Sequence, residues 1–226
     1  MKDVFIILWT QDMYHPTTRR CIEGLKATDL SMAELITYDN AYNPAFVQTD
    51  LYEDIADYCE GRPMILIRDT VMVKDAQWVY KLLQCVNSSG ASVVGCVHKY
   101  KDTASGYYGV DFNVEMDIIN YAGATNHPDY AYTCAVAGPL ILIMKPEMIH
   151  FDPEYNNTDH IYLDICMQQW LKEGRVAAAL DVVATNVGDP LRDMRHFKGK
   201  WGEFIKNELP ARLKKPEDVK SGKYGG

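Results

Sequence analysis

The chain has 226 residues and a formal net charge of −8, from 23 Lys and Arg against 31 Asp and Glu. This length fits one domain and suffices to bury a large core without disulfides or a metal. An acidic chain is a poor default binder of nucleic acid, because phosphate contacts need clustered Lys and Arg. No apolar run reaches the roughly 20 residues of a membrane span. Composition therefore excludes a transmembrane segment and argues against a nucleic-acid partner.

The N-terminus and the cysteines bear on the compartment. Met1-Lys2-Asp3 leads directly into an apolar run, without the small-residue cleavage site of a secretory signal. Six cysteines are scattered without a CxxC pair: Cys21, Cys59, Cys85, Cys96, Cys134 and Cys166. In a chain without an export signal we expect them to be reduced and mostly buried. The sequence thus predicts a cytoplasmic protein.

The first hundred residues alternate between buried strands and amphipathic helices. Strands are predicted at residues 4–9, 33–38, 63–67 and 91–97, and helices from residue 16, over 51–58 and over 76–86. This alternation favours an α/β fold with a mostly parallel sheet, in which ligands bind beyond the carboxyl ends of the strands. Polar residues follow three of these strands: Thr10-Gln11, Asp39-Asn40 and Arg68-Asp69-Thr70.

The second half of the chain has longer polar stretches. We expect strands at residues 107–112, 136–144 and 175–183, helices at 158–174 and 201–207, and a long loop at 120–132. We expect one domain over residues 1–210, with a nucleotide-binding half at about 1–100 and an acceptor half at about 101–210. Residues 211–226 are predicted to be a mobile basic tail.

Three ordered groups of segments carry a resemblance. The first group is residues 4–10 with residues 34–40, and the second is residues 65–73, which contain Arg68-Asp69-Thr70. The third runs from Gly138 through Phe151-Asp152 to Asp164 and Gly174. In this order they resemble the family-2-type glycosyltransferases of the GT-A fold. The resemblance implies a single-domain GT-A-like α/β fold, in which a mostly parallel mixed sheet is flanked by helices.

The resemblance also implies an activity. Such an enzyme moves a sugar from a nucleoside-diphosphate sugar, such as a UDP-sugar, to an acceptor hydroxyl. The acceptor is unknown here: a saccharide, a lipid-linked molecule or a protein. Mn²⁺ or Mg²⁺ would neutralise the leaving diphosphate, since both ions take oxygen ligands and keep substrate phosphates as partners. Inversion is expected, because no nucleophile arrangement for retention is visible.

The nucleotide-binding candidates stand at strand ends. By resemblance, Asp39 and Asn40 hold the base or ribose, Thr10 and Gln11 line the base, and Arg68 holds phosphate. A carboxylate suits the first role because it accepts hydrogen bonds from base N–H and ribose hydroxyl groups. The same residues also permit a structural interpretation. Asp39 would form an Asx turn, Thr10 and Gln11 would lie in an ordinary loop, and Arg68 would pair with a surface acid.

The metal candidates are Asp69, Asn186 and His196. Asp69 matches the position of the family's metal-binding acidic motif, with a turn-capping aspartate as the alternative. Asn186 stands where many members carry a metal- or phosphate-binding histidine. Asn is a poorer ligand for a hard cation than a carboxylate, so His196 is a candidate substitute; the alternative is a surface histidine.

The acceptor-side base is the weakest part of the match. The family's acidic pair falls on Ile161 and Tyr162 when the segments are aligned without gaps. One inserted residue brings Asp159 close to that pair, which makes Asp159 a candidate base, although it would also cap the helix well. Asp164 is the second candidate, and a satisfied helix carboxylate is its alternative.

These departures leave two other functions open. One is a GT-A-fold protein that binds a nucleotide or nucleotide sugar and has lost catalysis. The other is an interaction domain without a nucleotide site. Metal-dependent binding of UDP or GDP without transfer would favour the first, and absence of any nucleotide effect on stability would favour the second.

Overall fold

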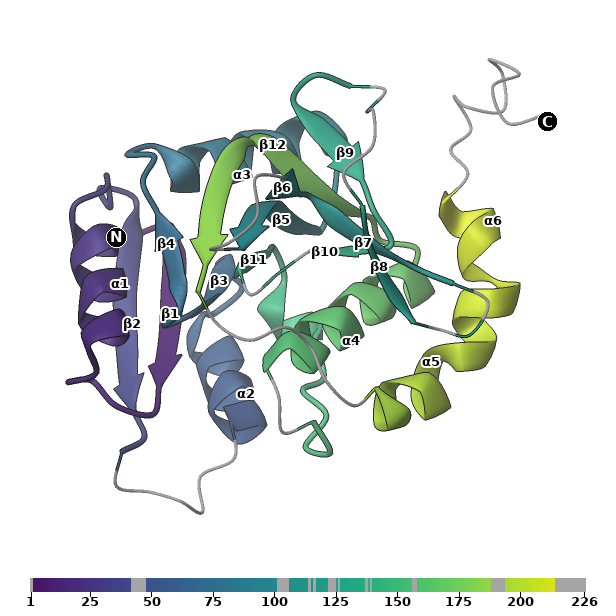
Figure 1. The fold of residues 1–226 in the computed structure, drawn as a ribbon, viewed down its shortest axis with the longest axis horizontal. Helices are drawn as coiled ribbons and strands as arrows, with labels where there is room; N and C mark the ends of the chain where they lie inside the picture. Colours follow the sequence, from purple (N-terminus) through teal and green to yellow (C-terminus); the bar gives the residue numbers. More distant parts are fainter. Residues whose placement is uncertain are drawn as a thin grey trace.

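A computed structural model describes residues 2–41, 48–100, 106–113, 115, 117–121, 125, 127–136, 138, 140–155, 158–187 and 194–213. Within them, a central sheet carries helices on both faces (Figure 1).

The central sheet has the strand order β2-β1-β3-β11-β5-β12-β4. These strands are β1 Val4–Thr10, β2 Ala33–Asp39, β3 Met64–Arg68, β4 Val71–Val73, β5 Val93–Tyr100, β11 Leu140–Ile143 and β12 Val176–Asn186. The pairs β1–β2, β1–β3 and β5–β12 are parallel, while β11 is antiparallel to both of its neighbours and β4 is antiparallel to β12. The predicted mostly parallel mixed sheet is confirmed.

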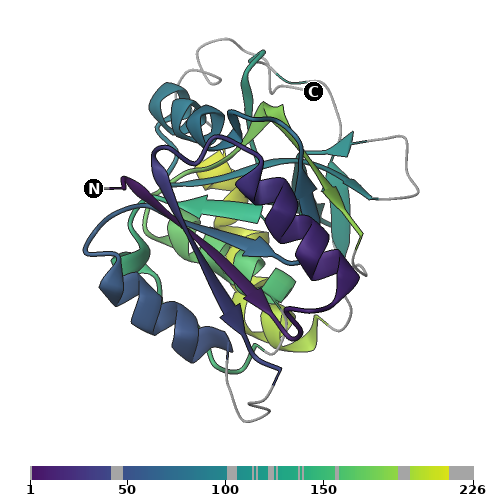
Figure 2. The same ribbon diagram turned by 90° about the vertical axis from the view of Figure 1, so that its left-hand side faces the viewer.

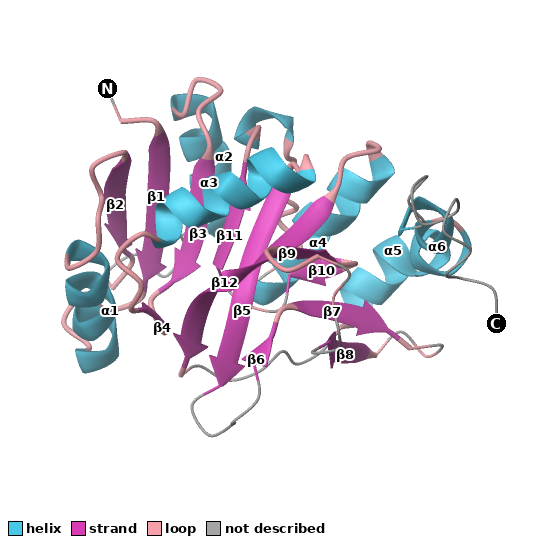
Figure 3. Cartoon of the chain, turned by 90° about the horizontal axis from the view of Figure 1, so that it is seen from above, coloured by secondary structure: helices cyan, strands magenta, loops and turns pink. Residues whose placement is uncertain are grey.

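Shorter strands extend this sheet and build a second one. β6 (Gly106–Tyr107) pairs with β5, and β9 (Tyr130–Tyr132) pairs with β12. β10 (Ala135–Val136), β7 (Gly109–Phe112) and β8 (Ile118–Tyr121) form the small sheet. The small sheet lies between the central sheet and the last two helices (Figures 1 and 3).

Helices pack on the two faces through separate apolar clusters. α1 (Pro16–Lys26) and α3 (Trp78–Ser89) share one cluster with the alternate residues of β1 and β3. α2 (Gln48–Tyr58), α4 (Thr158–Leu171), α5 (Arg195–Asn207) and α6 (Leu209–Leu213) contribute to the other. A short 3-10 helix, η1, spans Pro146–Met148. Figure 2 looks onto the side where α1 and α2 flank β1 and β2.

Local sequence explains where these helices begin and end. Pro16 opens α1, where its missing N–H is not needed, and the His15 Nδ1 atom accepts a hydrogen bond from the Thr17 amide. α3 ends at Gly90, whose φ of 65° is a left-handed conformation that glycine adopts without strain. Trp78, at the start of α3, is fully buried and donates from Nε1 to Thr28 Oγ1 at 3.0 Å.

The second half differs from its prediction in several places. The expected strand at residues 136–144 is two strands in different sheets, β10 and β11, because the chain turns at Gly138. A Cβ on Gly138 would lie 2.6 Å from His98 Cγ, so only glycine fits against that buried ring. The predicted loop at 120–132 begins in β8 and ends in β9. A register shift between Ala179 and Val183 lets β12 continue to Asn186 instead of ending at Val183.

The C-terminal helices also depart from expectation. The helix predicted to start at residue 201 begins six residues earlier, at Arg195. α6 then runs past the expected domain boundary at 210, and Arg212 Nη1 donates to the Trp170 carbonyl at 2.7 Å. Residues 214–226 of the predicted tail lie outside the described residues.

The cysteines behave as predicted. All six are free and buried. Burial raises the pKa of Cys21, Cys85 and Cys166 to about 12, so these thiols stay protonated and unreactive. Among the described residues, no helix combines the length and the apolar character that a bilayer crossing requires.

Candidate functional site

Three neighbouring parallel strands, β2, β1 and β3, end at one edge of the sheet. Thr10 at the end of β1 lies opposite Asp39 at the end of β2, and Trp9 lies between Tyr38 and Arg68. The structure therefore brings together the strand-end residues that the sequence assigned to a nucleotide. Successive side chains of a strand point to opposite faces of the sheet. Thr10 and Asp39 therefore lie on the α1 side, and Trp9, Tyr38 and Arg68 lie on the α2 side.

The Asp69 carboxylate is held by two buried hydroxyls. Thr10 Oγ1 donates to Asp69 Oδ2 at 2.6 Å, and Thr18 Oγ1 of α1 donates to the same oxygen at 3.0 Å. Thr10 and Thr18 are 0% and 1% exposed, whereas Asp69 is half-buried. Both bonds reach Oδ2, and no described side chain donates to Oδ1. The buried Thr10 hydroxyl thus holds Asp69, and the expectation that Thr10 lines a nucleoside stays a prediction.

The end of β12 lies beside the same turn. Thr70 Oγ1 donates to Asn186 Oδ1 at 3.0 Å, and the Val187 amide donates to the Thr70 carbonyl at 3.1 Å. Asn186 is 2% exposed. Two of the predicted metal candidates, Asp69 and Asn186, are thus neighbours although 117 positions separate them in the chain.

The remaining nucleotide candidates lie at the surface of this edge. Asp39 is exposed, and its Oδ1 accepts a hydrogen bond from the Ala41 amide at 3.0 Å, which is the Asx turn of the structural interpretation. Gln11 is also exposed, and Asn40 is tied to β1 by its amide, which donates to the Thr10 carbonyl at 2.9 Å. The turn engages one carboxylate oxygen of Asp39, so the other oxygen is available to a ligand.

Arg68, a predicted phosphate ligand, lies in a row with two aromatic side chains on the α2 side that the sequence did not single out. Tyr38, Trp9 and Arg68 occupy matching positions on adjacent strands. The Trp9 Nε1 atom is buried and has no hydrogen-bond partner among the described residues, while Tyr38 is 37% exposed. Burial raises the pKa of Tyr52 on α2, and the charge of Arg68 opposes that rise, which places Arg68 close to α2. An aromatic residue at a strand end is usually interpreted as a core residue. The alternation of side chains along each strand could nevertheless have shown that Tyr38, Trp9 and Arg68 share one face of the sheet.

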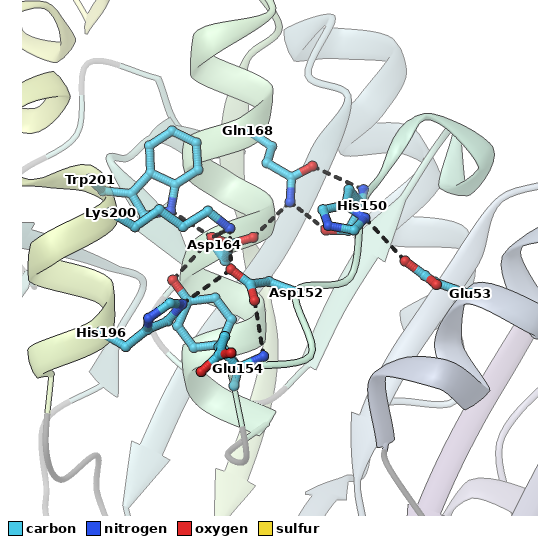
Figure 4. Close-up of polar contacts among 10 residues, drawn as sticks. Glu53, His150, Asp152, Glu154, Asp164, Gln168, His196, Lys200 and Trp201 are labelled. Atoms are coloured by element: carbon cyan, nitrogen blue, oxygen red, sulfur yellow. Dashed lines mark hydrogen bonds and ion pairs between the residues drawn. The ribbon is translucent and has the colours of Figure 1, made fainter.

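A second polar cluster joins α4, the segment before it and α5 (Figure 4). Asp164 is 2% exposed, and its Oδ1 accepts from Tyr155 Oη at 3.1 Å, Trp201 Nε1 at 2.6 Å and Lys200 Nζ at 2.8 Å. Its Oδ2 accepts from Gln168 Nε2 at 2.7 Å. Four donors satisfy this carboxylate, so its structure matches the helix-carboxylate alternative. Asp159 belongs to the first turn of α4, but its side chain lies outside the described part.

Lys200 links Asp164 to a second carboxylate. Its Nζ donates to Asp152 Oδ2 at 2.6 Å, and His196 Nε2 lies 3.1 Å from that same oxygen. Burial alone would raise the pKa of Asp152, but the hydrogen bonds from Lys200, the Glu154 amide and His196 outweigh it and lower that pKa to about 2. Asp152 is therefore ionised at neutral pH.

His196 belongs to this second cluster. Its ring contacts the Tyr155 ring edge-on at 4.7 Å, and one ring nitrogen is bonded to Asp152. Among the described residues, no three His, Cys, Asp or Glu side chains group as a metal site. The predicted metal set contains only two side chains of these types, Asp69 and His196, and it stays a prediction; in this structure His196 is bonded to Asp152.

Comparison with known proteins adds structural likeness only. No protein-family model matches the chain, and no curated protein sequence matches it. GalNAc-T7, solved with UDP, GalNAc and Mn²⁺, superposes with a TM-score of 0.63 and 12% identity over 83% of this chain and 44% of that chain. The mannosyltransferase PcManGT from Pyrobaculum calidifontis, solved with GDP-Man and Mn²⁺, has a TM-score of 0.59 and 10% identity, over 99% of this chain and 76% of that chain. A197 from STIV has a TM-score of 0.53 and 11% identity, over 84% of this chain and 87% of that chain.

The fold is GT-A-like. At 10–12% identity these likenesses establish the arrangement of the sheet and helices, and membership of family 2 stays a prediction. The chain spans less than half the length of the GalNAc-T7 chain.

Proposed function

We propose that this protein binds a nucleoside-diphosphate sugar at the edge formed by β1, β2 and β3 and transfers its sugar to an acceptor hydroxyl. The observation that carries the proposal is the Asp69 carboxylate, clamped by Thr10 and Thr18 at the end of β3 in a GT-A-like fold. Two structural neighbours were solved with UDP or GDP-Man together with Mn²⁺. Exposed Asp39 and Gln11 would contact the nucleoside, and Arg68 the phosphates.

A divalent cation is part of this proposal. Asp69 Oδ1 offers one hard oxygen ligand beside Asn186, which fits a partial site that substrate phosphates and water complete. When bound, Mn²⁺ or Mg²⁺ would neutralise charge on the leaving diphosphate. The chain's own part is to fix Asp69, through two hydroxyls that are themselves buried, and to present Arg68 as a second positive group.

We favour an inverting, single-displacement transfer by a hexosyltransferase-type enzyme. The acceptor oxygen attacks the anomeric carbon as the bond from that carbon to the diphosphate breaks, so the acceptor must lose its proton. The rival function is a nucleotide-sugar-binding protein without catalysis. It is supported by the hydrogen bonding of Asp164, one of the two predicted bases, whose oxygens already accept from four donors.

A thermal-shift panel of UDP- and GDP-sugars, with and without Mn²⁺, tests the binding step. A ligand at 100 times its Kd stabilises the folded state by about 2.7 kcal/mol, so a clear rise in Tm is expected with nucleotide and metal together. Asp69→Asn preserves the shape of the side chain and should abolish the rise, as should a chelator. Asp54→Asn, an exposed carboxylate on α2, is the matched control.

Two outcomes separate the alternatives. Full ligand stabilisation in Asp69→Asn would refute the assigned site. Stabilisation in the wild type without donor hydrolysis or sugar transfer would support the binding protein instead of the enzyme.

A further inference from the structure

A carboxylate fixes the orientation and the tautomer of the His196 imidazole. Its Nε2 lies 3.1 Å from Asp152 Oδ2, and the Tyr155 ring packs against it at 4.7 Å. Since Asp152 is ionised and can only accept, Nε2 must carry the proton of this hydrogen bond. The neutral ring then presents its lone pair on Nδ1, to which no described residue donates a hydrogen bond. The side chain is 43% exposed, so a substrate can reach it.

Three charged side chains lie beside the ring. Lys200 Nζ lies 2.6 Å from Asp152 Oδ2 and 2.8 Å from Asp164 Oδ1, so the lysine bridges the two carboxyl groups. Tyr155, Trp201 and Gln168, which complete the cluster, are neutral.

Other titratable groups lie close to the cluster. His160 contacts the Tyr155 ring, and the Glu154 amide donates to Asp152 Oδ1 at 3.0 Å. On α5 itself, Lys198 is paired with Asp117 at 2.7 Å, and Arg195 precedes His196. The paired Lys198 adds no net charge.

The cluster is carried by α4 and α5, and both helices begin at the side of the molecule where β1 and β2 end (Figure 1). His196 is the second residue of α5. Figure 4 shows His196 and Gln168 at opposite ends of the cluster; His196 is 43% exposed and Gln168 is buried.

We propose that His196 is the general base for the acceptor hydroxyl and that Asp152 is its positioning residue. The inference rests on the proposed function and replaces Asp159 and Asp164 as candidate bases. The acceptor O–H proton moves to His196 Nδ1 as its oxygen forms the bond to the anomeric carbon of the donor. The bond from that carbon to the diphosphate breaks, and the nucleoside diphosphate leaves with the electron pair. Asp152 stabilises the resulting imidazolium through Nε2, and Lys200 keeps Asp152 in place.

The matched pair His196→Gln and His150→Gln tests this role. His150 is also paired with an acid, its Nδ1 lying 3.1 Å from Glu53 Oε1, but it is 72% exposed and stands outside the proposed site. The readouts are hydrolysis of UDP- and GDP-sugars, with water as acceptor, and the thermal shift by the same nucleotides with Mn²⁺. We expect His196→Gln to lower kcat about 10²- to 10⁴-fold, the usual worth of general-base catalysis, and to leave the thermal shift unchanged. His150→Gln should leave both unchanged.

The pH profile separates catalysis from a structural role. In the wild type, kcat should fall on the acidic side as His196 becomes protonated before the reaction, and this limb should vanish in His196→Gln. Asp152→Asn should retain the limb but move it to lower pH, because the ring loses its carboxylate partner. Histidine NMR supplies a readout independent of turnover: the wild-type ring should be the Nε2–H tautomer.

The outcomes are distinguishable from those of the proposed function. Absence of any nucleotide effect on wild-type Tm refutes the donor site itself. Nucleotide binding by the wild type without hydrolysis, or an unchanged kcat and acidic limb in His196→Gln, overturns the base assignment and leaves the donor site standing. An Nδ1–H tautomer also overturns it.

Discussion

At the scale of single residues, the proposed donor site depends on two buried hydroxyls that hold the Asp69 carboxylate. Thr18 donates to Asp69 from the first turns of α1 and is 1% exposed, so its hydrogen bond is shielded from water. A hydrogen bond to a charged group contributes about 1.5–3 kcal/mol when well buried, and Asp69 is only half-buried. The hydroxyl of Thr18 thus links the helix to the strand end.

Replacing Thr18 by Val keeps the shape and removes this bond. We expect Thr18→Val to lower the free energy of unfolding by about 1–2 kcal/mol, measured by urea denaturation, because Asp69 loses one of its two donors. Thr17→Val, at the half-buried neighbouring position, is the control and should change stability by less than about 0.5 kcal/mol. Equal effects of the two variants would contradict a stabilising role for the hydrogen bond from Thr18 to Asp69.

The lowered pKa of Asp152 predicts a pH-dependent contribution to stability. Its folded pKa of about 2 lies below the ordinary value of 3.8. The stabilisation is therefore complete above about pH 4 and is lost as the pH falls toward 2. A difference of nearly two pKa units corresponds to about 2 kcal/mol.

Asp152→Asn should remove this contribution. Urea unfolding at pH 5 should show the variant less stable than the wild type by about 2 kcal/mol, and the gap should narrow at pH 3 and below. A gap of constant size across this range would contradict the pairing of Asp152 with Lys200 and His196.

Part of the site was predictable from residue types and their order. Asp69 and Asn186 were singled out from positions far apart in the chain, and the structure makes them neighbours through Thr70. The burial of Thr10 was not predictable, because a threonine at a strand end reads the same whether it faces a ligand or an aspartate. The partner of His196 could not be found either, since Asp152 lies 44 positions away and no short-range pattern joins them.

At the scale of elements, α5 positions the second cluster although two glycines weaken it. It carries His196, Lys200 and Trp201. Gly199 directly precedes Lys200, and Gly202 directly follows Trp201. A Cβ added at either glycine would meet no atom within 4 Å. Glycine in a helix interior costs roughly 1 kcal/mol relative to alanine.

Gly199→Ala and Gly202→Ala should each raise the free energy of unfolding by about 0.5–1 kcal/mol in a denaturant titration. The contrasting variant is Gly95→Ala in β5, where a Cβ would lie 2.6 Å from Val136 Cγ1 and 2.8 Å from its Cβ. Overpacking there, between the central and the small sheet, should destabilise the protein by about 1–3 kcal/mol. Destabilisation by the α5 substitutions would show that those glycines serve a packing or motional role.

The elements differ in how far the sequence predicts them. Regular alternation in the first hundred residues predicted each of β1, β2, β3, β5, α1, α2 and α3 to within a few residues. The apolar run at 136–144 was wrongly predicted to be one strand. Hydrophobicity indicates that a residue is buried, but it does not indicate in which sheet the residue lies. Gly138 marks the crossing between sheets, but its close partner His98 is distant in sequence. β8 and β9 were hidden by polar, turn-rich composition around them.

At the scale of the whole molecule, the two predicted halves are interleaved in one sheet. β11, from the second half, inserts antiparallel between β3 and β5, and β12 pairs with both β5 and β4. The Asp69 turn after β3 is likewise tied to Asn186 at the end of β12. Neither half can therefore complete its hydrogen bonding or its core alone, although each supplies its own share of the proposed site.

This topology predicts a single cooperative unfolding transition for residues 2–213. Trp78 is buried between α3 and the first strands, whereas Trp201 is buried beside Asp164 on α5, so the two rings report on opposite halves. Variants that retain one or the other tryptophan, with the remaining three replaced by Phe, should give the same urea midpoint by fluorescence as by far-UV circular dichroism of the same variant. A midpoint for Trp201 fluorescence clearly below the circular-dichroism midpoint would contradict the single transition. It would mean that α5, and with it the proposed base, detaches from the sheet before the donor half unfolds.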